Sequence, residues 1–466
     1  MAILEQMGNA WRIRELRRKI LITLGLLALC RVGAYVPLPG VNVAALQRIV
    51  QQGGGGVLSL LNLFSGGALG RAAIFGLGIM PYITASIMFT LLANVIPSLE
   101  ELRKQGAAGQ RKLNQYTRLA TIFVCLFQGS ILLRALLSSQ VGGETIMASG
   151  MATSWLGTVR FLVTGAILLT AGTMFLMWLG EQIDQHGIGN GISLIITIGI
   201  LARLPSAIYE LKLNVQTAES QQNAILKVAL LLMLFVAIVV AIIYITQGER
   251  RIPVQQQKHV RGPRVYGGQK HYLPLRVNTA GVMPIIFASV LLQFPQTIAH
   301  WARMQSAPGG FWSGFFASIE DAFGMGGGEV HLTYIVVYGM LIFFFCYFWT
   351  AVVFNPREMS ENLQSYGSFV PGIRPGRRTA NYLEGIMNRV TLAGAFFLLI
   401  IALMPTFIFA GLGVGWGVAG FLGGTSILIV VGVTLDLVRR VNEHLEMRRY
   451  SGFGAGAGGR RRSRRR

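Results

Sequence analysis

The sequence predicts an all-α polytopic membrane protein with ten transmembrane helices. Hydrophobic residues make up 53% of the 466 residues and charged residues only 13%, whereas soluble domains carry about a quarter charged residues. Apolar stretches of about 20 residues, the length that an α-helix needs to cross hydrocarbon, recur along the chain. Lys and Arg gather in alternate segments between these stretches, as the positive-inside rule requires.

The predicted spans extend over almost the full length of the chain. They cover residues 18–36, 72–96, 116–138, 156–180, 190–205, 224–246, 279–299, 333–354, 386–410 and 424–440. The basic run before the first span resembles the start of a signal peptide, but no small-residue cleavage site follows, so this helix is expected to stay. The basic residues place both termini in the cytoplasm. An even number of spans is then required, which agrees with ten.

The ten spans divide into two halves of five, residues 1–210 and 211–450, followed by a basic Gly/Arg tail at 451–466. Because each half holds an odd number of spans, the second half enters the membrane from the opposite face. This topology is compatible with two pseudo-symmetric inverted halves and with a functional site at their interface. Two long basic loops, 248–277 and 355–384, are expected in the cytoplasm, and the first has a strand-like centre.

One apolar segment is too short to cross the membrane. Val57–Phe64 is followed at once by Ser65, Gly66 and Gly67. Residues 57–70 therefore predict a half-helix that enters the membrane region and turns back. Irregular backbone at that depth is tolerated only inside protein or beside a wet cavity, so this segment indicates a cavity.

The sequence contains no signature of enzyme chemistry. HExxH, GxSxG and P-loop motifs are absent, and Cys30, Cys125 and Cys346 stand far apart without metal-ligand spacing. No acidic residue stands in the middle of a predicted span, where ion-coupled transporters usually carry one. We therefore expect no enzyme, no catalytic or metal site and no cofactor.

Isoleucine recurs at helical spacing in two of the predicted spans. Ile79, Ile83 and Ile87 lie in the second span, and Ile192 and Ile196 lie in the fifth. Residues four apart share one face of a helix. One interpretation is ordinary lipid-facing or packing surface. The other is an apolar constriction that excludes water and ions by dewetting and still yields to a passing chain.

Six long blocks resemble the SecY/Sec61-alpha family, whose bacterial members are the channel subunits of the Sec protein translocon. They are LFSGGALGRAAIFGLGIMPYITASIM (63–88), GIGNGISLIIT (187–197), GERRIPVQ (248–255), YLPLRVNTAGVMPIIFASVLLQFP (272–295), GIRPGRRTANYLEGIMNRVTLAGA (372–395) and GGTSILIVVGVTLD (423–436). The resemblance implies a channel in the bacterial plasma membrane that passes unfolded secretory chains and releases apolar segments sideways into lipid. It implies as partners the SecE and SecG subunits, the SecA ATPase, the ribosome with its rRNA, polypeptides that carry a signal sequence, and membrane lipid.

The resemblance also assigns roles to individual residues. The pore ring would be formed by Ile79, Ile83, Ile192, Ile196, Ile286 and Ile429. The plug that closes the channel would include Leu60, Leu61, Leu63, Phe64, Ser65, Gly66 and Gly67. The lateral gate, between the second and seventh spans, would include Thr84, Ile87, Asn278, Thr279 and Val290. A ring of branched apolar side chains offers no fixed hydrogen bonds, so any sequence could slide through it.

The basic loops become a docking platform under the same resemblance. Its arginines are Arg250, Arg251, Arg261, Arg264, Arg374, Arg377 and Arg378. Phosphate attraction would draw such loops to the ribosome, and the alternative is a solvated positive-inside charge. The tail, ending RRRSRRR, either contacts rRNA or anionic lipid or serves topology alone. A secondary transporter and a membrane-anchored RNA-binding protein remain the rival interpretations.

Overall fold

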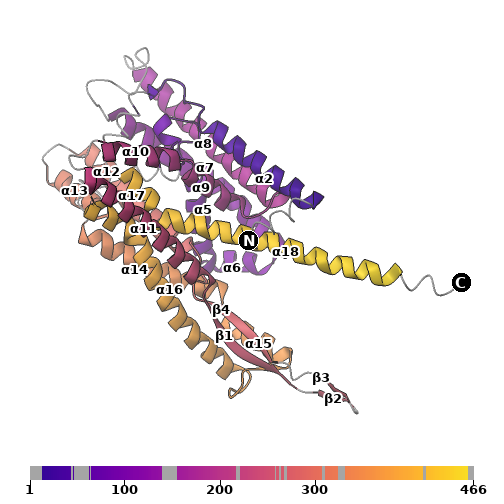
Figure 1. The fold of residues 1–466 in the computed structure, drawn as a ribbon. Helices are drawn as coiled ribbons and strands as arrows, with labels where there is room; N and C mark the ends of the chain where they lie inside the picture. The colour runs from indigo at the N-terminus through magenta and orange to yellow at the C-terminus, as the bar shows by residue number, and fades with distance from the viewer. Residues whose placement is uncertain are drawn as a thin grey trace. The chain divides into compact units, whose positions relative to one another are not determined.

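The computed structural model describes residues 13–43, 46, 62, 65–138, 155–216, 221–257, 259–261, 264–266, 270–306, 310–323, 331–412 and 416–459. These residues are mainly helical (Figure 1). The chain divides into two compact units, which are described separately below. Unit 1 comprises the chain up to Glu210 together with the part from Ile429 onward, and unit 2 comprises Leu211–Leu428.

Unit 1 is built from helices. They are α2 (Arg14–Gly33), α5 (Met80–Val95), α6 (Pro97–Lys104), α7 (Ala107–Ser138), α8 (Trp155–His186), α9 (Gly191–Leu201), the first part of α10 (Leu204–Gln216) and most of α18 (Gly424–Gly459). Gly172 lets α8 approach the segment that precedes α5, because a Cβ at position 172 would lie 2.3 Å from the carbonyl oxygen of Ile74. Leu133, Phe161 and Leu169 fill the core beside this contact.

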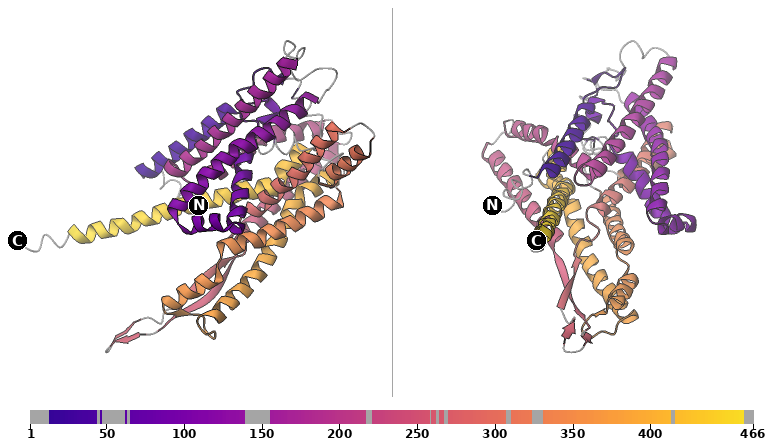
Figure 2. Two further views of the ribbon diagram at one scale, coloured as in Figure 1. Left: turned by 180° about the vertical axis from the view of Figure 1, so that it is seen from behind. Right: turned by 90° about the vertical axis from the view of Figure 1, so that its right-hand side faces the viewer.

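Unit 2 combines helices with a small sheet. The helices are α11 (Gln221–Gln247), α12 (Met283–Gln305), α13 (Phe311–Phe323), α14 (Leu332–Val353), α15 (Pro356–Ser365), α16 (Arg377–Leu412) and α17 (Trp416–Leu422). Figure 2 shows α14 and α16 running side by side, and the two helices are in contact. The start of α18 packs closely on α16, since a Cβ at Gly424 would lie 2.1 Å from the carbonyl oxygen of Ile401.

The sheet of unit 2 joins segments far apart in the chain. β1 (Glu249–Gln256) pairs antiparallel with β4 (Lys270–Arg276) and, on its other edge, with β5 (Ser368–Phe369), giving the order β4-β1-β5. β2 (His259–Arg261) and β3 (Arg264–Tyr266) pair as a separate two-stranded ribbon beyond it. The strand-like centre predicted for the loop 248–277 is therefore a hairpin.

Six helices of the described residues are long and apolar enough to cross a membrane. They cover Ala107–Arg134, Trp155–His186, Gly191–Leu213, Ile225–Gln247, Leu332–Ser365 and Arg377–Ile408. Met80–Ala93 and Pro97–Lys104 form a pair bent by 98° that passes the same test jointly, and α12 holds a shorter apolar stretch, Met283–Leu292. The predicted polytopic helical fold is confirmed. The count of ten spans, the inverted relation of the halves and the domain limits stay predictions.

Two helix boundaries differ from the spans expected from hydropathy. The second span was expected from residue 72, but α5 begins at Met80, because Gly78 has a left-handed φ of 60° and Pro81 stands at the helix start. The ninth span was expected from residue 386, but α16 begins at Arg377, directly after Pro375 and Gly376. Its first turns carry charged residues, so hydropathy underestimates its length.

Candidate functional site

The described part of the predicted plug is a compact series of turns in unit 1. It comprises Asn62 and residues 65–71, and we call it the knot, although the chain is not threaded. Gly66 and Gly67 have φ values of 65° and 84°, and a short 3₁₀ turn follows at Leu69–Arg71. The Oδ1 atom of Asn62 accepts a hydrogen bond from the Gly70 N–H at 2.9 Å, and the carbonyl oxygen of Asn62 accepts one from the Gly67 N–H at 2.9 Å. Asn62 thus ties both ends of the knot together. Leu60, Leu61, Leu63 and Phe64 lie outside the described residues.

This knot is fastened to the chain that leaves α2. The Leu38 N–H donates to the carbonyl oxygen of Ala72 at 2.7 Å, and the Ile74 N–H donates to that of Val36 at 2.9 Å. These bonds flank an antiparallel bridge between Pro37 and Ala73. The segment after the knot is therefore held like a two-residue strand pair, an attachment that sequence reasoning missed because it joins irregular segments.

The candidate ring isoleucines of unit 1 are mostly buried. Ile79, Ile83, Ile196 and Ile429 each expose less than a tenth of their surface, at 3%, 8%, 6% and 3%. Ile192 is half-buried and faces α8, since a Cβ at Gly180 would lie 3.4 Å from its Cγ1 atom. In unit 2, Ile286 is 7% exposed on α12. Their convergence into one ring stays a prediction.

The candidate gate residues lie on elements of both units. In unit 1, Thr84 and Ile87 are buried on α5. In unit 2, Val290 is buried on α12, and Asn278 and Thr279 are half-buried in the turn that precedes this helix. The Thr279 hydroxyl donates to the carbonyl oxygen of Arg276 at 2.9 Å, which caps the end of β4. The gate itself stays a prediction.

The two basic loops form one folded platform in unit 2. β1 comes from the first loop and β5 from the second, and Gln255 pairs with Phe369 in the sheet. Beneath the sheet, apolar side chains of both loops and of the adjoining helices form one buried cluster: Ile252, Leu275, Phe354, Val370, Leu383 and Met387. The platform therefore has a core of its own, and its basic side chains are presented by a defined surface.

Five of the candidate docking arginines are exposed on this platform. Arg250 and Arg251 are exposed on β1, and Arg374, Arg377 and Arg378 are exposed on the turn before α16 and on its first residues. Arg261 on β2 pairs in register with Arg264 on β3.

The turn that carries Arg374 is fixed from two sides. The Thr379 hydroxyl donates to the Arg374 carbonyl oxygen at 3.0 Å, and the Ser360 hydroxyl of α15 donates to that of Gly376 at 2.8 Å. Gly372 and Gly376 have φ values of 83° and 96°, which L side chains rarely adopt. The backbone of this turn is thus held in place, and the Arg374 side chain is exposed.

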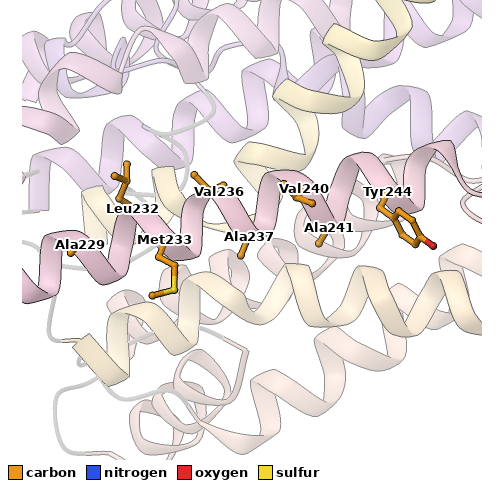
Figure 3. A pocket seen from close by; sticks show the side chains of 8 residues that line it. All are labelled: Ala229, Leu232, Met233, Val236, Ala237, Val240, Ala241 and Tyr244. Carbon is orange, nitrogen blue, oxygen red and sulfur yellow. The ribbon is translucent and has the colours of Figure 1, made fainter.

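An apolar groove also runs along α11 in unit 2. Figure 3 shows the side chains that line it, all on this helix: Ala229, Leu232, Met233, Val236, Ala237, Val240, Ala241 and Tyr244. The most apolar 18-residue window of Ile225–Gln247 has a mean hydropathy of 3.3, and only 17% of this window is buried. Such a surface suits lipid or another apolar helix, and the Tyr244 hydroxyl is the one polar side-chain group among the residues that line it.

Two acidic side chains of unit 1 fix its local structure. Glu181 of α8 accepts two hydrogen bonds from Arg118 of α7, at 2.9 and 2.7 Å. The Asp184 carboxylate accepts from the Gly191 N–H at 2.7 Å and fixes the turn before α9. Within the described part of the chain, no group of three His, Cys, Asp or Glu side chains could hold a metal ion.

Apolar helices long enough to span a membrane, together with a basic folded platform, define a polytopic helical membrane protein. The family model for SecY matches residues 73–438. The chain belongs to the SecY family.

The similar proteins are consistent with this assignment over almost their full length. The protein translocase subunit SecY of Vibrio cholerae is 42% identical over 441 residues, covering 94% of both chains. That of Thermotoga maritima is 40% identical over 451 residues, covering 96% of both chains. The chain from Escherichia coli strain K12 is 42% identical over 437 residues, covering 94% of this chain and 93% of its relative.

Solved structures share the fold. A protein-conducting channel aligns with a TM-score of 0.62 at 16% identity, covering 92% of both chains. A SecY structure aligns with a TM-score of 0.59 at 16% identity, covering 92% of both chains, and the plug domain of that protein stabilises the closed state of its translocation channel. Sec61 in a canine ribosome-channel complex from the endoplasmic reticulum aligns with a TM-score of 0.58 at 15% identity, again covering 92% of both chains.

Proposed function

We propose that this chain is the protein-conducting channel of a bacterial plasma membrane, with both termini in the cytoplasm. It passes unfolded secretory polypeptides across the membrane and inserts membrane proteins through a lateral gate. The observation that carries the proposal is the match to protein translocase subunits along 94–96% of this chain. A polytopic helical bundle with an irregular closing knot suits such a channel, because irregular backbone at membrane depth needs protein or a cavity around it.

The proposed seal combines the plug with the isoleucine ring. Ile79, Ile83, Ile192, Ile196, Ile286 and Ile429 form an apolar constriction that blocks ions by dewetting, and the segment from Leu60 to Gly67 closes it from outside. The gate opens between α5 and α12, so that an apolar signal sequence partitions into lipid by the hydrophobic effect.

The proposed partners fall into two groups. The platform built on β1, β4 and β5 docks the SecA motor or the ribosome, and its exposed arginines favour the phosphates of rRNA. The SecE and SecG subunits pack against the apolar membrane surface of the chain. The chain itself performs no catalysis, so the driving force comes from the docked partner.

Crosslinking of a stalled secretory chain tests this function. In a variant without Cys30, Cys125 and Cys346, single cysteines replace Ile83 and Ile286. Both positions are expected to crosslink to the stalled chain. Matched cysteines replace Ile167 on α8 and Ile298 on α12, which are 55% and 52% exposed. Equal crosslinking at the ring and control positions would contradict a central pore.

A further inference from the structure

Tyr35, just beyond the C-terminal end of α2, lies beside two arginine side chains. The Cζ atom of Arg71 is 4.2 Å from the centre of the Tyr35 ring, and the Cζ atom of Arg31 is 5.8 Å from it. Both distances are within the range of cation–π attraction. Tyr35 is 61% exposed, so the ring is held at the surface mainly by these two side chains and by its own backbone.

Arg31 also reaches the plug knot directly. Its Nη1 atom donates to the carbonyl oxygen of Gly66 at 3.3 Å. Gly66 lies against α9, since a Cβ at this position would be 2.8 Å from the Cα atom of Gly199. The glycine turn is therefore enclosed between the Arg31 side chain and the backbone of α9.

The knot and its attachment meet at Ala72. Bonds within the knot run from Asn62 to Gly70, and the bridge to Val36–Leu38 begins at Ala72. One further bond, from the Ala73 N–H to the carbonyl oxygen of Ala68 at 2.9 Å, crosses this boundary. Ala72 has φ 48° and ψ 41°, a left-handed conformation that is unfavourable for a residue with a Cβ. Such strain is found where a backbone changes direction or switches between states.

From this arrangement we infer that Arg31 is a positioning residue that clasps the plug in its closed place, with Tyr35 and Arg71 as the other half of the clasp. The inference rests on the proposed channel function. Opening breaks the Arg31–Gly66 hydrogen bond and the bond from the Ala73 N–H to Ala68 and turns the knot about Ala72, while the bridge between residues 36–38 and 72–74 stays intact. The knot thus leaves as one tied unit.

The charges make this clasp easy to release. Within the described residues, neither Arg31 nor Arg71 forms an ion pair with a carboxylate. The Nη1 atom of Arg71 is buried and has no hydrogen-bond partner. A buried donor without a partner destabilises the state that buries it. Hydration of this atom on opening offsets part of the loss of the Arg31–Gly66 bond.

Conductance of the full-length chain, reconstituted with its partner subunits in planar bilayers, tests the clasp. Arg31→Met removes the donor at similar side-chain length and is expected to raise resting conductance about tenfold, the effect of losing one charged hydrogen bond. Arg31→Lys keeps a cationic donor and is expected to restore part of the seal. Arg160→Met, an exposed arginine at the start of α8, is the matched control and is expected to conduct like the wild type.

Two further variants keep the outcome decisive. Tyr35→Leu removes the ring and is expected to open the channel, whereas Tyr35→Phe keeps the ring and is expected to stay closed. This pair decides the question if Arg31→Met does not fold, as judged by its melting temperature.

Ile83→Gly is the positive control for the pore. If Ile83→Gly conducts and the clasp variants match the wild type, the clasp is wrong and the channel stands. If Ile83→Gly also stays silent, the proposed function itself fails.

Discussion

Gln257 donates its backbone N–H to the carbonyl oxygen of Gly367 at 2.9 Å, and this bond joins the two basic loops of unit 2. The neighbouring pairing of Gln255 with Phe369 extends the sheet across the same junction. These main-chain bonds therefore couple any displacement of one loop to the other. A partner that docked on either loop, as proposed, would act on the platform as a whole, including α16, whose Leu383 is fully buried beneath it.

Replacement of Arg374 by Glu is expected to impair partner-driven translocation strongly while leaving membrane insertion and folding intact. The Arg374 side chain is exposed, and only its carbonyl oxygen takes part in fixing the turn. The variant therefore changes the charge of the docking surface without disturbing its backbone. Transport of a secretory protein into reconstituted vesicles measures the effect. Arg357→Glu on α15, also exposed, is the matched control, and normal transport by Arg374→Glu would contradict the docking role.

Replacement of Leu383 by Ala is expected to destabilise the platform by about 2–5 kcal/mol, the usual cost of removing a large buried aliphatic side chain. Leu383 is 0% exposed within the cluster that both loops share. Leu392→Ala on the same helix is the control, since Leu392 is 53% exposed. Limited proteolysis of the loops in detergent reports the change. The shared core would be wrong if both variants were cleaved at the same rate.

The spanning helices could be predicted because their length follows from membrane thickness, but their ends could not. The run from residue 72 is apolar throughout, so hydropathy alone does not reveal that Gly78 and Pro81 delay α5 to Met80. The signal was present in these two residues. Conversely, α13 is a 13-residue helix, too short for the length that identifies a span.

The candidate site was predictable only in part, since its residue types are local and its contacts are not. The arginines and the isoleucine spacing are visible in the sequence. The pairing of β5 with β1 is not, because a two-residue strand has no pattern of its own. The bond from Arg31 to Gly66 depends on a loop closure that no local pattern encodes.

The packing of α13 on α12 is expected to weaken at acid pH. Glu320 accepts hydrogen bonds from His300 at 2.8 Å and from Arg303 at 2.9 Å. Partial burial raises the pKa of Glu320, but the hydrogen bond from His300 and the charges of His300 and Arg303 outweigh it and hold the pKa below its ordinary value of 4.5. At pH values above 4.5 the Glu320 carboxylate is ionised and makes its full contribution to the packing of α13. The stabilisation is lost as the pH falls through the lowered pKa.

A fluorophore on a cysteine at Phe315 reports this docking between neutral and acid pH. The variant Glu320→Gln is expected to loosen α13 at neutral pH and to remove the transition at acid pH. Glu361→Gln, an exposed carboxylate on α15, is expected to leave both unchanged. An acid transition that persists in Glu320→Gln would assign the pH dependence to another group.

Replacement of Ile83 and Ile286 by small or polar residues is expected to raise ion leakage and to relax the selection of signal sequences. Both side chains are buried, at 8% and 7% exposure, and branched apolar groups at a constriction exclude water by dewetting. A polar group there lowers the cost of a continuous water column, so ions follow. Planar bilayers measure the leak, and export of a reporter with a weakened signal measures the selectivity. Ile342, fully buried on α14, provides the matched control, because Ile342→Ala leaves a cavity in a packed helix without altering the pore. Equal conductance in the ring and control variants would show that these isoleucines are ordinary packing.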